Sequence, residues 1–213
     1  MSSTPDRAQR RADARSNAAR IVAAARRVFA RGDGLGSLEE IAREAGVGIA
    51  TLYRHFSHRE SLASAVFTQI LHDEFAPALE AARDDPSPLH GLKTAAEVLV
   101  TAVARVDGLI ASAGNFPALT DELLRGFADP IYEIVVRAQQ AGELRADIQR
   151  DDIPRVLVMA VAGLTVPDLA HGAYLRYVTL VFDALKPEHA TPLPPVEPGV
   201  EAGQAPAAPR ATV

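Results

Sequence analysis

Hydrophobic residues recur along most of this chain at intervals of three and four, the spacing that places them on one face of an α-helix. The stripe over residues 14–31, for example, consists of Ile21, Val22, Ala25, Val28 and Phe29. No stretch shows the strict alternation of a half-buried strand. The pattern predicts an all-α fold of about nine helices, at 14–31, 37–45, 48–56, 58–83, 89–106, 107–115, 120–141 (kinked by Pro130), 152–166 and 168–185.

Capping residues predict where the second helix begins and ends, and where the third helix gives way to the fourth. Ser37 and Glu40 have the spacing of a capping box, and "SHRE" at 57–60 is a second one. Gly46 follows the second helix, where a sharp turn requires a left-handed residue. Helix, tight turn and helix within twenty residues are typical of a helix-turn-helix.

These elements divide the chain into four parts. Residues 1–13 are polar and rich in arginine, and predict a flexible basic arm. Residues 14–57 form a helix-turn-helix head, and 58–185 a helical body. Residues 186–213 hold seven of the fifteen prolines and no aromatic residue, which predicts a disordered tail. Its "PLPP" is only weak evidence for a proline-rich partner motif.

Composition excludes several classes of protein. The chain has no cysteine, so it has no disulfide, thiolate catalysis or cysteine-ligated zinc. The absence of cysteine, of a secretory signal and of a membrane-spanning apolar run predicts a cytoplasmic protein with no membrane partner. His72 in "HDE" has no carboxylate three or four residues on, so we expect no metal. We also expect no cofactor and no catalysis, because no phosphate-binding glycine loop or nucleophile elbow is present.

Charge is distributed unevenly. Residues 1–60 hold eleven arginines against seven acidic residues, a net charge of +4, whereas the whole chain has −5. A basic first quarter on an acidic body suggests that one end meets a polyanion. Solvated charged helices would give the same pattern, so charge alone leaves both readings open.

The short helix over residues 49–56 carries the candidate chemistry. Ile49, Leu52 and Phe56 share the face that should anchor it to the core. On the outward side, small residues would let the helix enter a DNA major groove, and donors at the far end would reach phosphates. We expect Gly48, Ala50 and Thr51 to lie nearest base edges, and Tyr53, Arg54 and His55 to lie near the backbone.

The helix-turn-helix and the residues that follow it resemble those of a known family. "SLEEIAREAGVGIATLYRHFSHRESL" is similar to the DNA-binding signature of the tetracycline-repressor (TetR) family of transcription regulators, over about residues 15–65. The matching pieces are Ile41-Ala42, Ala45-Gly46-Val47 and Leu52-Tyr53-Arg54-His55-Phe56, followed by Arg59 and Leu62. The family often has a lysine near position 59, where arginine could contact a phosphate equally well.

The resemblance implies a homodimeric regulator, usually a repressor, that binds a double-stranded DNA operator. Ser37, His58 and Arg59 complete the candidate DNA-binding residues, together with Arg15, which ends the arginine-rich stretch where a mobile chain could follow the DNA backbone. The resemblance also implies that the last two helices form the dimer interface, and both carry apolar stripes. Those stripes could also pack on the body of their own subunit. The candidate interface residues are Val156, Ala160, Leu164, Tyr174, Tyr177 and Val181.

The family further implies a small-molecule effector bound inside the body. The candidate pocket residues are Phe67, Leu71, Phe75, Phe116, Phe127, Tyr132 and Met159, although plain core is the commoner role for each of them. The set is apolar, so an apolar or amphipathic effector is favoured over a sugar phosphate. The alternative function is a helical small-molecule-binding or interaction protein whose DNA-binding head is not gated by ligand.

Overall fold

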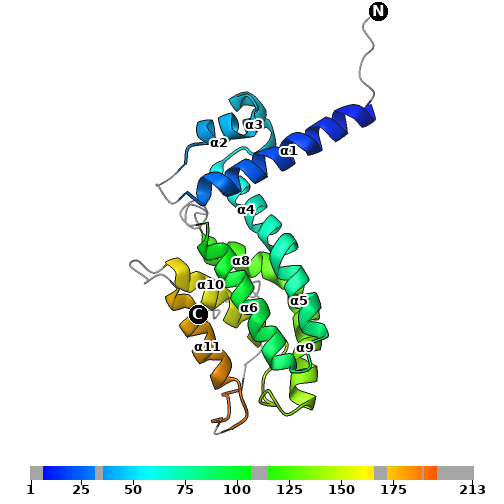
Figure 1. Ribbon diagram of the computed structural model, residues 1–213, viewed down its shortest axis with the longest axis vertical. Coiled ribbons are helices and arrows are strands. Elements are labelled where there is room, and N and C mark those ends of the chain that lie inside the picture. Colours follow the sequence, from blue (N-terminus) through cyan, green and yellow to red (C-terminus); the bar gives the residue numbers. More distant parts are fainter. Residues whose placement is uncertain (1–6, 32–35, 107–114, 166–171, 189, 196–213) are drawn as a thin grey trace, which may run out of the picture.

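The structure is a head of three helices joined to an elongated helical body (Figure 1). This computed structural model describes residues 7–31, 36–106, 115–165, 172–188 and 190–195, and of these the side chains from residue 13 onward except at 116, 117 and 165. The head consists of α1 (Arg7–Phe29), α2 (Leu38–Ala45) and α3 (Ile49–His55). Every regular element in the described residues is helical, which confirms the predicted all-α fold.

The first helix is longer than its sequence pattern predicted. It begins at Arg7, so residues 7–13 are helical and do not form the flexible arm that we expected. Residues 1–6 lie outside the described part. The N-terminal half of α1 extends past α2 and α3 in Figure 1, while the buried stripe of Ile21, Val28 and Phe29 packs in its C-terminal half.

The predicted long helix 58–83 is helical throughout but interrupted. It consists of α4 (Arg59–Ile70), a π-helical turn (Leu71–Phe75) and α5 (Ala76–Arg83). In the π-turn the Ala76 N–H donates to the carbonyl of Leu71, five residues back. Pro77 explains the interruption, because it has no N–H to donate and its ring would clash with the carbonyl four residues earlier in an α-helix.

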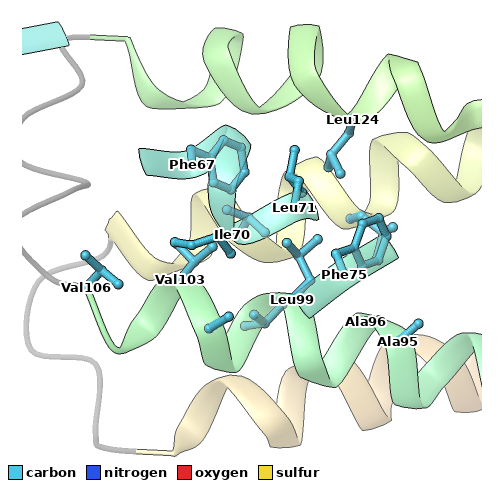
Figure 2. Close-up of a cluster of buried hydrophobic side chains, with 14 of the residues drawn as sticks. Phe67, Ile70, Leu71, Phe75, Ala95, Ala96, Leu99, Val103, Val106 and Leu124 are labelled. Atoms are coloured by element: carbon cyan, nitrogen blue, oxygen red, sulfur yellow. The ribbon is translucent and has the colours of Figure 1, made fainter. Parts of the chain in front are cut away.

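Helix α6 (Pro88–Ala104) runs through the body and supplies much of its core. Figure 2 shows its side chains meeting those of α4 and the π-turn. Close packing against α5 depends on Gly91, since a Cβ there would lie 2.9 Å from the Cα of Ala82. The buried residues of this segment and the turn after it recur at intervals of three and four: Leu92, Ala95, Ala96, Leu99, Val103 and Val106.

The predicted kinked helix 120–141 is two helices. They are α8 (Phe116–Leu124) and α9 (Ala128–Gln140), separated by a 3₁₀ turn at Arg125–Phe127. This break places Pro130 in the first turn of α9, where its missing N–H leaves no hydrogen bond unmade, so no kink is needed. The short helix predicted at 107–115 falls almost wholly outside the described residues.

The last two helices are shorter than predicted. Helix α10 (Asp152–Ala162) continues into a 3₁₀ turn at Gly163–Thr165, and α11 (Ala173–Ala184) begins after residues that are not described. Helix α10 packs on α8, and α11 packs on α6. Asp151 is the N-cap residue of α10, but no capping hydrogen bond from its side chain is made.

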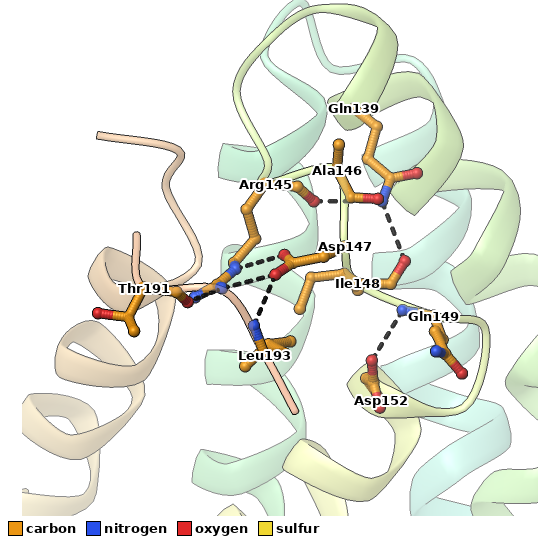
Figure 3. Close-up of polar contacts among 9 residues, drawn as sticks. All are labelled: Gln139, Arg145, Ala146, Asp147, Ile148, Gln149, Asp152, Thr191 and Leu193. Carbon is orange, nitrogen blue, oxygen red and sulfur yellow. Dashed lines mark hydrogen bonds and ion pairs between the residues drawn. The ribbon is translucent and has the colours of Figure 1, made fainter. Parts of the chain in front are cut away.

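The start of the predicted disordered tail is tied to the body (Figure 3). Arg145 holds Asp147 through Nε and Nη2, at 2.6 and 2.8 Å, and also donates to the carbonyl oxygen of Thr191. The Leu193 N–H donates to the same Asp147 carboxylate at 3.0 Å. Residues 186–195, with the exception of the undescribed residue 189, therefore form a strap over the α9–α10 connector, which the sequence did not predict. Residues 196–213 lie outside the described part.

Within the part of the chain that the structure describes, no helix is both long enough and apolar enough to cross a lipid bilayer.

Candidate nucleic-acid interface

The turn between α2 and α3 has the geometry that the sequence predicted. The Ser37 hydroxyl accepts from the Glu40 N–H at 3.1 Å and caps α2. Gly46 ends the helix with φ 64° and ψ 37°, in the left-handed region. The Arg20 guanidinium fixes this turn to α1 by donating to the carbonyl oxygens of Ala45 at 2.6 Å and Gly46 at 3.2 Å.

Helix α3 is anchored by one face and open on the other. Leu52 is fully buried and Phe56 is half-buried, but Ile49 is 36% exposed, so it anchors the helix less than predicted. On the outward side Ala50, Tyr53 and Arg54 are exposed, while Thr51 and His55 are half-buried. The Arg54 guanidinium donates to the Thr51 hydroxyl at 2.9 Å, so these two candidates lie together.

Gly48, the N-cap of α3, is not required by the fold of the free protein. Its φ of −69° is open to any residue, and a Cβ there would meet nothing within 4 Å. Among the described residues nothing covers the Gly48 backbone on the side where a Cβ would project, which is the property that a close approach to another molecule requires.

His58 and Arg59, the two candidate DNA contacts at the start of α4, both make contacts within the protein. His58, rather than Ser57, is the N-cap of this helix, since its Nδ1 accepts from the Ser61 N–H at 3.2 Å. Arg59 turns into the head: its guanidinium carbon lies 5.4 Å from the centre of the Phe29 ring, and Nη1 donates to the Gly36 carbonyl oxygen at 2.5 Å.

Much of the positive charge of the head is used inside the protein. Arg27 and Arg31 both pair with Glu44, at 3.0 Å each, and Arg31 also pairs with Glu40 at 3.1 Å. These hydrogen bonds lower the pKa of the Glu44 carboxyl, and the Glu44 partner raises the pKa of Arg31. Arg26 pairs with Glu74 of the π-turn.

Few head arginines are left to meet another molecule. Of those whose side chains are described, Arg15, Arg43 and Arg54 make neither an ion pair nor a hydrogen bond to a main-chain carbonyl within the described residues, whereas Arg20 and Arg59 donate to carbonyls of the head. Arg15 lies on the exposed surface of α1, and Ser37 is exposed but already engaged in its cap.

An apolar groove lies between the last two helices, at the opposite end of the chain. It encloses about 460 Å³ and is lined by Val156, Met159, Ala160, Gly163, Tyr174, Tyr177 and Val181. Several large apolar side chains stand exposed on these helices, including Met159 at 64%, Leu180 at 61% and Tyr177 at 54%. Five of the six predicted interface residues therefore line one surface, and Leu164 is half-buried beside it.

Comparison with known proteins agrees with this geometry. Residues 21–66, which span α1 to α4, match the family described as bacterial regulatory proteins, tetR family. A TetR transcriptional regulator from Streptomyces coelicolor has 29% sequence identity and a TM-score of 0.53, over 80% of this chain and 98% of its own. The DNA-binding head of this chain is that of the TetR family of bacterial regulatory proteins. Its family and fold are those of DNA-binding regulators.

Two further solved structures share the fold of this chain. RolR, solved with resorcinol, has a TM-score of 0.60 at 18% identity, covering 87% of this chain and 98% of its own. Thermus thermophilus FadR, a TetR-family repressor solved with lauroyl-CoA, has a TM-score of 0.53 at 20% identity, covering 85% and 100%. No curated protein matches the sequence of the regulator significantly.

The predicted effector pocket of the regulator is only partly assembled. Phe67, Leu71 and Phe75 lie in the core (Figure 2), each with at most 2% of its surface exposed. Phe127 is half-buried and packs edge-on against Phe75, with ring centres 5.2 Å apart. The side chain of Phe116 lies outside the described part.

Two of the pocket predictions are wrong for this structure of the regulator. Tyr132 is 37% exposed on α9, and Met159 is on the surface in the α10–α11 groove. Tyr132 follows the buried Ile131, and Met159 lies between the half-buried Val158 and Ala160, so periodicity alone could not decide whether either side chain points inward.

Sequence reasoning also missed Glu74. It accepts from Arg26 of α1 and from Arg105, just after α6, the latter at 2.8 Å, and so joins the head of the regulator to two parts of its body. Only the acidic "DE" before Pro77 marks this site in the sequence, and that signal does not identify the partners.

Proposed function

We propose that this regulator is a repressor that binds a palindromic DNA operator as a homodimer and is released by a small apolar or amphipathic molecule. The observation that carries the proposal is the exposed face of α3, where Ala50 and Tyr53 stand outward behind the open N-terminus at Gly48. A helix with a small leading end can enter the major groove, and its N-terminal residues then contact base edges.

The contacts divide by position along α3. Gly48, Ala50 and Thr51 lie nearest the base edges, and Thr51 reads them with Arg54 held against its hydroxyl. Tyr53 and His55 hold phosphates, which fix the register of the helix without reading sequence. Arg15 and His58 flank this surface as further backbone contacts.

The α10–α11 groove supports the dimer. A contiguous apolar surface of this kind is rarely left in water by a monomeric protein. A second copy, turned by a twofold axis, would present the same residues and form a four-helix bundle with the first. Two heads related by that axis would then meet half-sites about one helical turn, or a multiple of it, apart.

An effector in the body would act through the segment from α4 to α5. This segment has about the length of a 25-residue helix, roughly 40 Å, so a small tilt at its body end moves the head. Phe75 and Phe127 mark the body end, and Glu74 links it to α1 through Arg26. The ligands of RolR and FadR, both of similar fold, support a small apolar or amphipathic molecule here.

Selection from a random DNA library tests the DNA-binding half of the proposal. The expected result is a palindromic duplex whose affinity falls steeply between ~50 and ~200 mM salt. Tyr53→Ala should weaken the selected duplex and a mixed-sequence duplex to a similar extent, whereas Thr51→Val should change the preference at one or two base pairs. An unaltered affinity of Tyr53→Ala at moderate salt would contradict this docking.

One observation favours the second candidate, a DNA-binding protein that is not gated by ligand. Phe67, Leu71 and Phe75 are already packed together, so the predicted site has to open before it can hold a molecule. Reciprocal titration separates the two functions, because an effector that releases DNA must itself bind less tightly to the DNA complex, by the same factor. Resorcinol and lauroyl-CoA are suitable first probes.

A further inference from the structure

Arg59 is the first residue of α4 and occupies a position where the sequence suggested a phosphate contact. Its side chain points the other way. The guanidinium lies over the Phe29 ring, at 5.4 Å from the centroid, and donates to the Gly36 carbonyl oxygen at 2.5 Å. The Nη2 atom is shut off from solvent. These contacts leave the guanidinium inside the head.

The two partners of Arg59 belong to different elements. Phe29 is the last residue of α1 and is 1% exposed. Gly36 immediately precedes Ser37, the N-cap of α2, and lies so close to α1 that a Cβ on it would be 2.0 Å from the Val28 Cγ1. Arg59 therefore joins the end of α1, the start of α2 and the start of α4.

Helix α3 lies between the elements that Arg59 joins. Its N-terminal side follows α2, and its C-terminal side leads through His58 into α4. Arg20 fixes the turn before α3 to α1, and Arg59 fixes the beginning of the next helix to the same α1. The orientation of α3 relative to α1 thus depends on both arginines, although neither guanidinium is on the outward face of α3.

We infer that Arg59 is a positioning residue of the DNA-binding head and makes no contact with a DNA phosphate. The inference rests on the proposed docking of α3. A flat guanidinium can stack on a ring and donate sideways to a carbonyl at once, which a lysine ammonium cannot reproduce. A phosphate contact would have to break both interactions and draw a desolvated charge out of the head.

The deciding variant is Arg59→Lys, which keeps the charge and removes the planar group. The two probes are a duplex that the wild type has selected from a random library and a mixed-sequence duplex. We expect affinity for the selected duplex to fall about tenfold and affinity for the mixed duplex to stay within about twofold. The salt dependence should be unchanged. A phosphate contact predicts that lysine rescues binding to both duplexes, and that result would overturn the inference.

A second variant keeps the test decisive if the contact between Arg59 and the Phe29 ring is needed for the head to fold. Arg59→Gln removes the charge, and a lost phosphate contact would reduce the slope of log affinity against log salt by about 0.9. We expect a smaller change than this, whereas the matched control Arg15→Gln should show the full reduction. Thermal melting of each variant reports the folded fraction, and loss of fold alone would weaken both duplexes equally, which would also count against a positioning role.

Failure of the proposed docking is distinguishable from failure of this inference. If the wild type selects no sequence, the proposed function fails, and the salt slope of Arg59→Gln on the mixed duplex still decides whether Arg59 contacts phosphate. If the wild type selects a palindrome and Arg59→Lys binds it as tightly, the inference alone is overturned.

Discussion

Replacing Met159 with alanine tests the proposed dimer directly, because this side chain lines the α10–α11 groove and is 64% exposed in the single chain. The change removes three heavy atoms, which contribute ~2.4 kcal/mol when wholly buried. Since about two thirds of the side chain remains to be buried on association, about 1.5 kcal/mol is lost from each subunit. A twofold axis doubles the loss to ~3 kcal/mol, or a roughly hundredfold weaker dimer.

Sedimentation equilibrium over a range of protein concentrations measures this change. We expect Met159→Ala to shift the monomer–dimer midpoint to about hundredfold higher concentration. Its unfolding temperature as a monomer should be little altered, because the side chain has few intramolecular neighbours to lose. Operator binding should weaken at concentrations where the variant is monomeric, since two linked heads bind a palindrome more tightly than one.

Tyr132→Ala is the matched control. Tyr132 is also a large, partly exposed side chain, at 37%, but it lies on α9 and does not line the groove. It should leave the dimer unchanged. A Met159→Ala protein that dimerises as tightly as the wild type, or a wild type that remains monomeric at high concentration, would refute the assignment of this surface to a second copy.

Three further predictions follow from other parts of the molecule. Gly46→Ala should lower the free energy of unfolding by about 1–2 kcal/mol in urea titrations, because Gly46 has φ 64° and an added Cβ would lie 2.8 Å from the Arg20 Nη2. Glu74→Gln should destabilise the protein by about 1 kcal/mol at low salt and by less at high salt, since it breaks two ion pairs. The hydrogen bond from Arg145 holds the pKa of Asp147 well below its usual range, so its contribution is present above the unfolded pKa of ~3.9 and is lost as the pH falls toward the folded value. Asp147→Asn should therefore expose the strap to limited proteolysis at neutral pH and flatten the acid dependence of unfolding.

Local signals in the sequence were sufficient for the head. The spacing of Ser37, Gly46 and Leu52 defines a cap, a left-handed turn and an anchor, and each is set by residues within a few positions of one another. The inward face of α6 was equally readable, because a helix buried along one side repeats its pattern over several turns. Element ends were less accurate, as the early start of α1 at Arg7 shows.

The functions of individual arginines could not be predicted, because their partners are distant in sequence. Arg59 pairs with Gly36 and Phe29, and Arg26 with Glu74, which lies 48 residues away. The excess of arginine in the first 60 residues left a DNA-facing charge and solvated charged helices both open, and neither reading includes the ion pairs that Arg26, Arg27 and Arg31 make within the protein. Met159 was misplaced for a related reason, since a methionine fits a core and an interface equally well.

The strap over residues 186–195 shows a third limit. Proline-rich composition predicted disorder from residue 186 onward, but this segment is held by main-chain groups, the Thr191 carbonyl and the Leu193 N–H. Main-chain hydrogen bonds cannot be inferred from amino-acid composition, because every residue type except proline can form them through both of its main-chain groups. Only the Arg145 and Asp147 side chains could have signalled it, and in sequence they resemble an ordinary exposed ion pair.

The number of residues in the π-turn at Leu71–Phe75 determines how far the head is rotated about the helix axis relative to the body. A π-turn holds one residue more than the α-helical turn it replaces, and each α-helical residue rotates the chain by about 100°. A chimaera that joined this head and α4 to the body of a relative with an uninterrupted helix would therefore face its recognition helix about 100° away from its present direction. A new head joined before Leu71 keeps the present direction of the recognition helix if the body keeps its π-turn. Otherwise, the direction is kept only when both proteins carry the same extra residue.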